Sequence, residues 1–378
     1  MIINDYSSWC INSVVVKVVA HCNLRCDYCY RNINSDEHRP NIMPLEMFEK
    51  IISDYIESTD NPQKPLVVVW HGGEPLIAGV DYFQNVLEMQ RRLGKNRKFI
   101  NVVQTNATLV NKVWAKFIKE NNIVVGVSID GPKKFNDIHR KNRVGNSTFE
   151  MSERGLENLK EAGNSFSVIC VVSNENYDKA KLFLDFFASI GVLTVSFIPC
   201  FDYNLKHTLD NKKYEIFMKT AFDYWMSKYK GSIKIRFLED IMRKIVCLAK
   251  NQKCYTGCEL SDMCGRNIAV LDNGDIYACA CLTPVKHMKL GNVKTLSLKE
   301  IPKTTSFKKM VEQYNDINKK CLTCDVKSIC STGCLNRRLS CYSSEKIDYF
   351  CEARRKIINH VKNSLPKYFP IKEPVNKV

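Results

Sequence analysis

The stretch HCNLRCDYCY, His21–Tyr30, directly follows the apolar run SVVVKVVA, Ser13–Ala20. It places three cysteines, Cys22, Cys26 and Cys29, within eight residues. Four thiolates complete a tetrahedral zinc site or an ordinary iron–sulfur cluster, so three thiolates leave one position for another ligand. In a [4Fe-4S] cluster, the open iron can be chelated by a molecule that presents an amine and a carboxylate. Structural zinc is the alternative, although zinc sites favour CxxC pairs with a fourth Cys or His nearby.

Short β-branched runs alternate with longer amphipathic stretches between Ser13 and Ile198. The predicted strands are residues 13–19, 65–70, 99–105, 123–129, 165–172 and 193–198, and the predicted helices are residues 45–56, 81–93, 111–121, 148–163 and 177–191. Six β/α alternations indicate a parallel sheet with crossover helices and a ligand site at the C-terminal ends of the strands. The first three cysteines follow the first strand. We therefore expect an α/β fold with a partial (β/α)6 TIM-type barrel.

The alternation stops beyond about Pro199, and cysteines become dense in the last third of the chain. Residues 213–229 predict a helix, and residues 267–279 predict a β-hairpin with Asp272, Asn273 and Gly274 in the turn. A second helix is expected at residues 352–365. We expect a barrel domain with a bridging helix over residues 1–230 and a C-terminal cysteine-rich domain with a β-hairpin and helices over residues 231–378.

Composition narrows the class of protein. A chain of 378 residues buries an ample core without disulfides, so its 18 cysteines indicate metal or redox chemistry. We find no signal peptide and no apolar run of about 20 residues, and we expect a cytoplasmic protein. The net charge of +16 is spread along the chain, which favours a solvated basic surface over a nucleic-acid or membrane partner.

The motif CNLRCDYCY at the end of the first strand resembles the signature of the radical S-adenosylmethionine (SAM) superfamily, with Tyr28 as the aromatic residue before the last cysteine. The resemblance implies that Cys22, Cys26 and Cys29 bind a [4Fe-4S] cluster and that SAM chelates its fourth iron. HGGEP, His71–Pro75, is similar to the family's GGEP motif, whose backbone and glutamate hold the SAM amine. The SAM-binding residues that the resemblance implies are Tyr28, Gly72, Gly73, Glu74, Gln104, Asn106, Ser128 and Arg140.

The C-terminal CxxCxxxxxCxxxC pattern resembles the SPASM extension of radical SAM peptide-modifying enzymes, which implies two auxiliary [4Fe-4S] clusters and three in total. The implied ligands are Cys258, Cys264, Cys279 and Cys334 for the first auxiliary cluster, and Cys321, Cys324, Cys330 and Cys351 for the second. Two zinc ribbons are the alternative. We expect most of the remaining cysteines to be small buried residues or spare thiols: Cys10, Cys170, Cys200, Cys247, Cys254, Cys281 and Cys341. Among these, Cys254 or Cys281 could replace Cys258 or Cys279 as a ligand.

The resemblance also implies a reaction, in which reductive cleavage of SAM gives a 5′-deoxyadenosyl radical that abstracts hydrogen from a substrate carbon. Length and cysteine spacing most resemble anaerobic sulfatase-maturating enzymes, which oxidise a peptidyl Cys or Ser to formylglycine. Three positions depart from that family: Ala280 replaces an aspartate proposed as the base, His71 replaces a glutamine, and Arg31 replaces a tyrosine. We therefore expect a thioether or carbon–carbon cross-link in a ribosomally made precursor peptide, with His71 and Arg31 as catalytic candidates. Sulfatase maturation is the alternative.

The expected partners are a precursor peptide or protein substrate and an electron donor such as ferredoxin or flavodoxin. The first strand begins by Ser13, so we expect leader recognition by a separate protein or by the basic surface. A multi-cluster iron–sulfur electron-transfer protein is the alternative from another class, although it needs neither an open iron nor GGEP. A zinc-containing nucleic-acid binder is disfavoured because no arginine-rich recognition helix is present.

Overall fold

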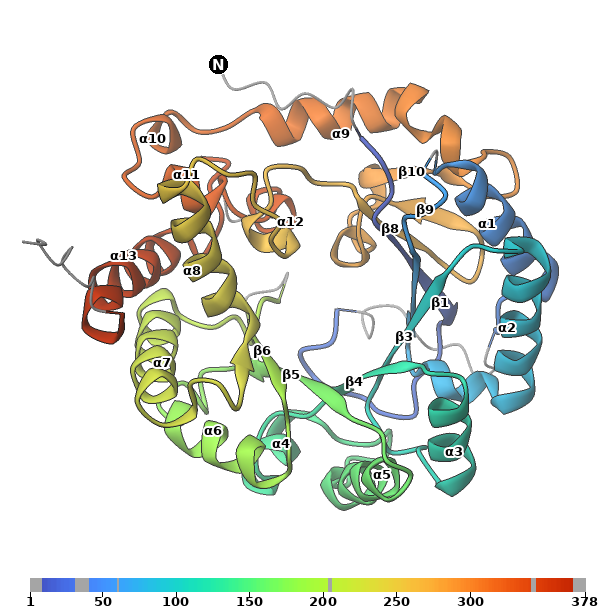
Figure 1. Cartoon of the computed structure of the whole chain (residues 1–378), viewed down its shortest axis with the longest axis horizontal. Coiled ribbons are helices and arrows are strands. Elements are labelled where there is room, and N and C mark those ends of the chain that lie inside the picture. Colours follow the sequence, from blue (N-terminus) through green and yellow to red (C-terminus); the bar gives the residue numbers. More distant parts are fainter. Residues whose placement is uncertain (1–8, 31–40, 60, 203–205, 341–344, 370–378) are drawn as a thin grey trace, which may run out of the picture. The chain divides into compact units, whose positions relative to one another are not determined.

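The structure is a computed structural model, and it describes residues 9–30, 41–59, 61–202, 206–340 and 345–369. The chain divides into two compact units, which are described separately below. Unit 1 comprises residues 1–170 and 263–316, and unit 2 comprises residues 171–262 and 317–378. Figure 1 labels the helices and strands of both units.

Unit 1 is built on a parallel sheet whose strands follow one another in chain order. The strands are β1 (Ser13–Val19), β2 (Leu66–Gly72), β3 (Phe99–Thr105), β4 (Val124–Ser128) and β5 (Phe166–Val172), and each pairs in parallel with the next. The helices between them are α1 (Leu45–Glu57), α2 (Val80–Gly94), α3 (Lys112–Glu120), α4 (Lys133–His139) and α5 (Phe149–Glu161). Figure 1 shows α1, α2 and α3 along one side of these strands. The predicted strands and helices are confirmed, whereas the short helix α4 was not predicted.

The burial of the strands explains why these runs form a sheet. In β2, buried and half-buried side chains alternate, as expected for a strand with faces in different environments. In β1, every residue after Ser13 is buried, as expected for a strand with both faces of the sheet covered; β1 pairs with β2 on one edge and with β8 (Asn267–Val270) on the other. The burial of β1 includes Lys17, which is 0% exposed. A buried cation in the central strand indicates that polar groups meet it inside unit 1.

The predicted β-hairpin is confirmed and extends the sheet of unit 1. Strand β8 pairs antiparallel with β9 (Asp275–Tyr277), and β9 pairs antiparallel with β10 (Lys289–Asn292). Gly274 in the turn has φ of +92°, a conformation that side chains with a Cβ rarely adopt. The rest of unit 1 includes helix α9 (Thr305–Asn315) and the short 3₁₀ segments η2 (Pro75–Ala78), η5 (Ala280–Leu282), η6 (Lys286–Met288) and η7 (Leu298–Lys303).

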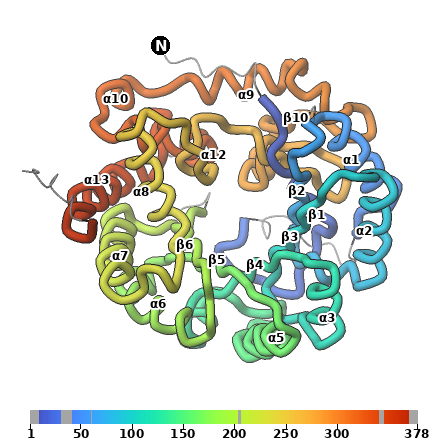
Figure 2. Tube along the Cα trace, in the orientation of Figure 1, coloured from blue at the N-terminus to red at the C-terminus, as the bar shows by residue number. Residues whose placement is uncertain are grey.

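Unit 2 is mainly helical. It contains α6 (Ala180–Ser189), β6 (Thr194–Pro199), α7 (Asn211–Tyr224), a π-helical turn η3 (Trp225–Tyr229), β7 (Lys234–Ile235), α8 (Arg236–Ala249), η4 (Cys258–Leu260), α10 (Lys319–Leu322), α11 (Lys327–Cys330), α12 (Leu335–Arg338) and α13 (Cys351–Tyr368). Strands β6 and β7 pair in parallel. Helix α13 packs against α7 and α8, and Figure 2 shows α7 and α13 side by side. The helices predicted at residues 213–229 and 352–365 are confirmed.

The domain boundary predicted near residue 230 stays a prediction. Among the described residues, no helix combines the length and the apolar composition needed to cross a lipid bilayer.

The core of unit 1 is centred on Trp70, which is 0% exposed. Its ring lies 5.1 Å from that of Phe48 in α1 and 5.2 Å from that of Phe83 in α2, and its Nε1–H donates to Asn101 Oδ1 at 3.0 Å. Replacing Trp70 with alanine should lower the free energy of unfolding by about 3–5 kcal/mol, because it leaves a cavity in the core, while Asn101 Oδ1 keeps its second donor, Gln90 Nε2, at 3.0 Å. Urea denaturation measures the change. Val113→Ala, at a side chain that is 62% exposed, is the control and should change stability by less than about 0.5 kcal/mol.

Candidate functional site

The first cysteine loop lies directly after β1, at the C-terminal end of the strand. Cys26 is buried, and Cys22 and Cys29 are half-buried. The loop folds on itself, since Cys29 N–H donates to Cys26 O at 3.1 Å and Leu24 N–H donates to the Cys22 sulfur at 3.4 Å. Burial, and then nearby Glu74, Cys26 and Cys29, raise the pKa of Cys22 to about 12. The three thiols therefore form one group.

The GGEP segment approaches this loop closely. Gly73 N–H donates to Val19 O at 2.8 Å, and Glu74 N–H donates to His21 O at 3.0 Å. A Cβ added at Gly73 would lie 2.0 Å from His21 O, and one added at Gly72 would lie 2.4 Å from Val19 O. Only glycine fits at these two positions, because any larger residue would push the backbone of the cysteine loop away.

Glu74 is 1% exposed and receives three hydrogen bonds from its own chain. Leu76 N–H and the Thr105 hydroxyl donate to Oε1 at 3.1 Å and 2.7 Å, and Asn106 N–H donates to Oε2 at 2.8 Å. Burial outweighs these donors and raises the pKa of Glu74 to about 7. The carboxylate therefore joins the end of β2 to the end of β3.

Polar side chains at the ends of β3 and β4 complete this edge of the sheet. The amide nitrogen of Asn106 lies 3.0 Å from Asn23 Oδ1 and 3.9 Å from the Cys22 sulfur. The Gln104 amide donates to the Ser128 hydroxyl at 2.8 Å. The structure thus places Asn106 against the cysteine loop and pairs Gln104 with Ser128.

Tyr28 and Arg140 meet at Asp130, a residue that the sequence analysis did not single out. The Tyr28 hydroxyl donates to Asp130 Oδ2, and Arg140 Nε donates to the same oxygen at 2.9 Å. The Arg140 guanidinium also lies 5.7 Å from the centre of the Tyr28 ring. Asp130 and Arg140 are 1% and 8% exposed. Asp130 could have been predicted as a site residue from the VSIDG run, because it is an acidic residue close after the end of β4.

His71 and Arg31 were the predicted catalytic residues. His71 is half-buried at the end of β2, and its Nδ1 accepts from Gly72 N–H at 2.7 Å. Arg31 lies outside the described residues.

The sequence analysis missed Lys17, which is paired in register with His71 on the neighbouring strand. Its Nζ donates to the Thr283 hydroxyl at 2.9 Å and to Ala280 O at 3.3 Å. Lys17 could have been noticed in the sequence, because it is the one charged residue within the apolar strand SVVVKVV.

The four cysteines assigned to the second auxiliary cluster come together in unit 2. Cys321, Cys324, Cys330 and Cys351 all line one cavity, with Val326 and Ile347 among its other walls. Burial, and then Cys330 and Cys321, raise the pKa of Cys351 to about 12. Four thiols around one cavity match the number of ligands that an iron–sulfur cluster requires.

The ligands assigned to the first auxiliary cluster are divided between the units. Cys264 and Cys279 belong to unit 1, and Cys258 and Cys334 belong to unit 2, so this assignment stays a prediction.

The remaining cysteines differ in burial: Cys170 and Cys200 are buried as expected, whereas Cys281 is exposed. Cys254 lies next to Cys247. Burial, and then the hydrogen bond with the Cys247 thiol, raise the pKa of Cys254 to about 11. Cys341 lies outside the described residues.

The donor groups fit the cofactors that the motifs imply. Both thiol groups lie where burial opposes their ionisation, and bound iron would reverse this preference by stabilising the thiolates. Beside the first group, the structure provides a carboxylate at Glu74 and a polar rim of Asn106, Gln104 and Ser128. These are suitable partners for an amine and for ribose hydroxyls.

Comparisons with known proteins agree with this geometry. Residues 16–187 match the radical SAM superfamily model, and residues 258–325 match the SPASM model, an iron–sulfur cluster-binding domain. The chain is a radical SAM enzyme with a SPASM domain. It therefore has the α/β fold that was predicted, with a partial barrel and a C-terminal SPASM domain, and SAM and iron–sulfur binding belong to these domains.

The relatives of this radical SAM enzyme extend over most of its length. A cysteine-type anaerobic sulfatase-maturating enzyme of Clostridium perfringens is 28% identical over 90% of this chain and 93% of its own. A serine-type enzyme of Bacteroides thetaiotaomicron is 29% identical over 92% of this chain and 89% of its own. The solved structure of native anSMEcpe with bound AdoMet has a TM-score of 0.84 and 26% identity, covering 94% of this chain and 98% of that one. The same protein is also known with a Cp18Cys peptide bound.

Replacing Gly73 with alanine should separate the GGEP segment of the radical SAM domain from the cysteine loop. The added Cβ cannot avoid His21 O, which belongs to the backbone. We expect SAM binding, measured by equilibrium dialysis on reconstituted protein, to weaken at least about tenfold, or about 1.4 kcal/mol. Gly79→Ala is the control, because no atom lies within 4 Å of its added Cβ and only its φ of +85° opposes the change. Equal SAM affinity in both variants would contradict this role of Gly73.

The raised pKa of Glu74 predicts a pH dependence of stability in the cluster-free protein. The folded state holds this proton up to about pH 7, whereas the unfolded state releases it near pH 4.5. Glu74 therefore contributes stability below pH 4.5 that is lost as the pH rises to about 7, by up to about 3 kcal/mol. The difference in unfolding free energy between wild type and Glu74→Gln, measured with urea, should fall over this interval. A difference that stays constant with pH would show that the pKa is not raised.

Proposed function

We propose that this radical SAM enzyme modifies a residue of a peptide or protein substrate, and that the modification is the oxidation of a peptidyl Cys or Ser to formylglycine. The similarity to cysteine-type and serine-type sulfatase-maturating enzymes over about nine-tenths of the chains is the observation that carries this proposal. It supports the alternative reading of the sequence better than the cross-linking reaction that we expected first. The peptide-bound structure of a protein with the same fold supports a peptide substrate.

The proposed cofactors are SAM and three [4Fe-4S] clusters. Cys22, Cys26 and Cys29 would hold the first cluster, and the two sets of SPASM cysteines would hold the others. When bound, the first cluster and SAM would supply the radical chemistry that removes hydrogen from a substrate carbon. The chain would bind the SAM amine at Glu74 and the GGEP backbone, and the ribose and carboxylate near Gln104, Ser128 and Arg140.

Arg140 and Tyr28 would act on this site through Asp130. The three side chains are joined at a single buried carboxylate oxygen, so the guanidinium is fixed in place before any ligand arrives. A fixed cation binds a carboxylate at a lower cost in side-chain entropy than a mobile one. We propose that Arg140 orients SAM rather than the substrate.

Cross-linking of a precursor peptide is the second candidate, and the residues beside Cys279 favour it. Ala280 offers no side-chain base, and its carbonyl accepts a hydrogen bond from the buried Lys17 ammonium at 3.3 Å. A cation here does not replace the carboxylate base that the sulfatase-maturating family is proposed to use. His71 and Arg31 remain proposed as substrate-facing residues.

The proposed partners include an electron donor such as ferredoxin or flavodoxin and, for the cross-linking candidate, a separate leader-recognition protein. The clusters need an external electron to begin each cleavage of SAM, and a small redox protein is a common source. The cytoplasmic location expected from the sequence is consistent with such donors and stays a proposal.

The test uses anaerobically reconstituted protein with SAM, dithionite and a peptide that contains Cys or Ser in a sulfatase-type sequence. We expect 5′-deoxyadenosine together with a new peptide aldehyde, detected by hydrazide labelling and mass spectrometry. Cys26→Ser should abolish both products, because the first cluster would lack a ligand. Loss of hydrogen without a carbonyl, on a precursor peptide, would favour cross-linking. Failure to cleave SAM with intact clusters would exclude both candidates.

A further inference from the structure

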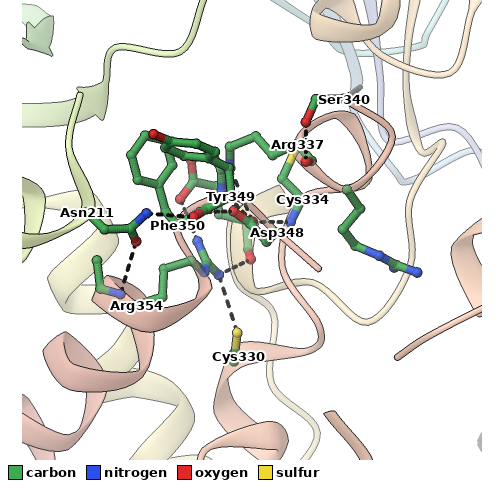
Figure 3. Close-up of polar contacts among 12 residues, drawn as sticks. Asn211, Cys330, Cys334, Arg337, Ser340, Asp348, Tyr349, Phe350 and Arg354 are labelled. Carbon is green, nitrogen blue, oxygen red and sulfur yellow. Dashed lines mark hydrogen bonds and ion pairs between the residues drawn. The ribbon is translucent and has the colours of Figure 1, made fainter. Parts of the chain in front are cut away.

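Unit 2 holds a compact group of four charged side chains, and Figure 3 labels three of them, Arg337, Asp348 and Arg354, near Cys330 and Cys334. Arg354, Arg337 and Asp348 are 1%, 6% and 3% exposed. Arg337 pairs with Asp348 at 2.9 Å and with Glu259 at 3.3 Å, and Arg354 pairs with Glu259 at 3.1 Å. Glu259 is half-buried, with 25% of its side chain exposed. The two positive and two negative charges balance, which offsets the loss of hydration of the three buried groups.

Asp348 anchors this group to the backbone around the cysteines. Its Oδ2 accepts from Cys334 N–H at 2.7 Å, and its Oδ1 accepts from Phe350 N–H at 2.9 Å. A Cβ added at Gly333, whose φ is +79°, would lie 2.5 Å from the Asp348 carboxylate. Burial opposes the ionisation of Asp348, but Arg337 and Arg354 outweigh it and hold its pKa below the usual value. Asp348 is thus a fixed anion.

Arg354 extends from this group to a proposed ligand. Its Nη2 lies 2.7 Å from Glu259 O and 3.9 Å from the Cys330 sulfur, and Figure 3 shows the guanidinium directed at that sulfur. Arg354 and Cys351 are three residues apart in α13, which places them on one face of the helix. Arg354 Nε is buried and has no hydrogen-bond acceptor among the described residues. A buried N–H without an acceptor costs stability, so this guanidinium retains a donor for a further group.

We propose that Arg354 tunes the second auxiliary cluster: its positive charge and its N–H groups raise the reduction potential of that cluster. A nearby cation favours the reduced cluster, which carries one more electron, and hydrogen bonds to its sulfurs act in the same direction. Burial keeps solvent and salt from screening the charge. Glu259 and Asp348 set how much of the positive charge the cluster experiences. The inference rests on the proposed binding of a [4Fe-4S] cluster by Cys321, Cys324, Cys330 and Cys351.

The test is a redox titration, followed by electron paramagnetic resonance, of the full-length reconstituted enzyme. Arg354→Gln should shift the midpoint potential of one auxiliary cluster to a more negative value, by at least a tenfold change in its reduction equilibrium, which is about 59 mV for one electron. Glu259→Gln removes a negative charge from the same group and should shift the midpoint in the opposite direction. A purely structural role would not produce shifts of opposite sign.

Lys356→Gln is the matched control, since Lys356 is also in α13 and its charge is paired with Glu215 and Glu352 at the surface. It removes one positive charge, but solvent screens that charge, and the midpoint should stay within a threefold change in the equilibrium. Arg354→Lys keeps the charge but lacks the planar guanidinium with its several N–H donors, and it should give an intermediate shift of the midpoint potential. If Arg354→Gln does not fold, Arg354→Lys and Glu259→Gln still test the sign.

Cys324→Ser identifies the affected signal, because it removes one ligand of the proposed cluster. An Arg354→Gln enzyme with wild-type iron and sulfide but an unchanged midpoint would overturn the role of Arg354 while leaving the cluster in place. Unchanged iron and spectra in Cys324→Ser would overturn the cluster itself, and the inference with it. The first outcome leaves the proposed peptide chemistry intact.

Discussion

The close approach of the GGEP backbone to the cysteine loop is the constraint on which the candidate SAM site depends. Two glycines let the end of β2 lie against Val19 and His21, where a Cβ would meet a carbonyl oxygen at 2.0–2.4 Å. This approach brings Glu74 under the loop, and Glu74 then binds the end of β3 through Thr105 and Asn106. Asn106 in turn reaches the Cys22 sulfur. The positions of the thiols therefore follow from contacts among three strand ends.

Buried charges accompany both groups of thiols that the structure brings together. Asp130 and Arg140 lie beside the first group, and Asp348 with Arg337 lies beside the second. Burying an ion pair is a poor way to gain stability, because desolvation offsets most of the attraction. Such pairs do fix geometry, since each charge is held by its partner in one orientation. In both places the ion pair fixes the orientation of side chains beside the thiols.

Much of the architecture was predictable, because its signals are local. The strands end at turn residues, and the hairpin around Gly274 and the helix after Cys351 were predicted from patterns a few residues long. The buried ionic contacts were not predictable, since Glu259 and Arg354 are 95 positions apart and their pairing depends on the tertiary fold. Lys17 looked like an interruption of an apolar strand until the fold placed Thr283 and Ala280 beside it. The reaction was harder to predict than the fold. Ala280, which stands in place of an aspartate base, led us to expect cross-linking, whereas the similarity over most of the chain favours the sulfatase-maturating enzymes.

The two groups of thiols differ in how they can acquire iron during biosynthesis. Cys22, Cys26 and Cys29 belong to one short loop, so a nascent chain carries all three long before unit 2 has been translated. The second auxiliary set needs Cys351, the first residue of α13, together with cysteines from α10, α11 and the segment between them. Its donors meet only when α13 has docked. Iron delivery to the proposed second auxiliary cluster would thus be tied to the completion of folding, and an assembly factor would have to recognise a nearly native protein.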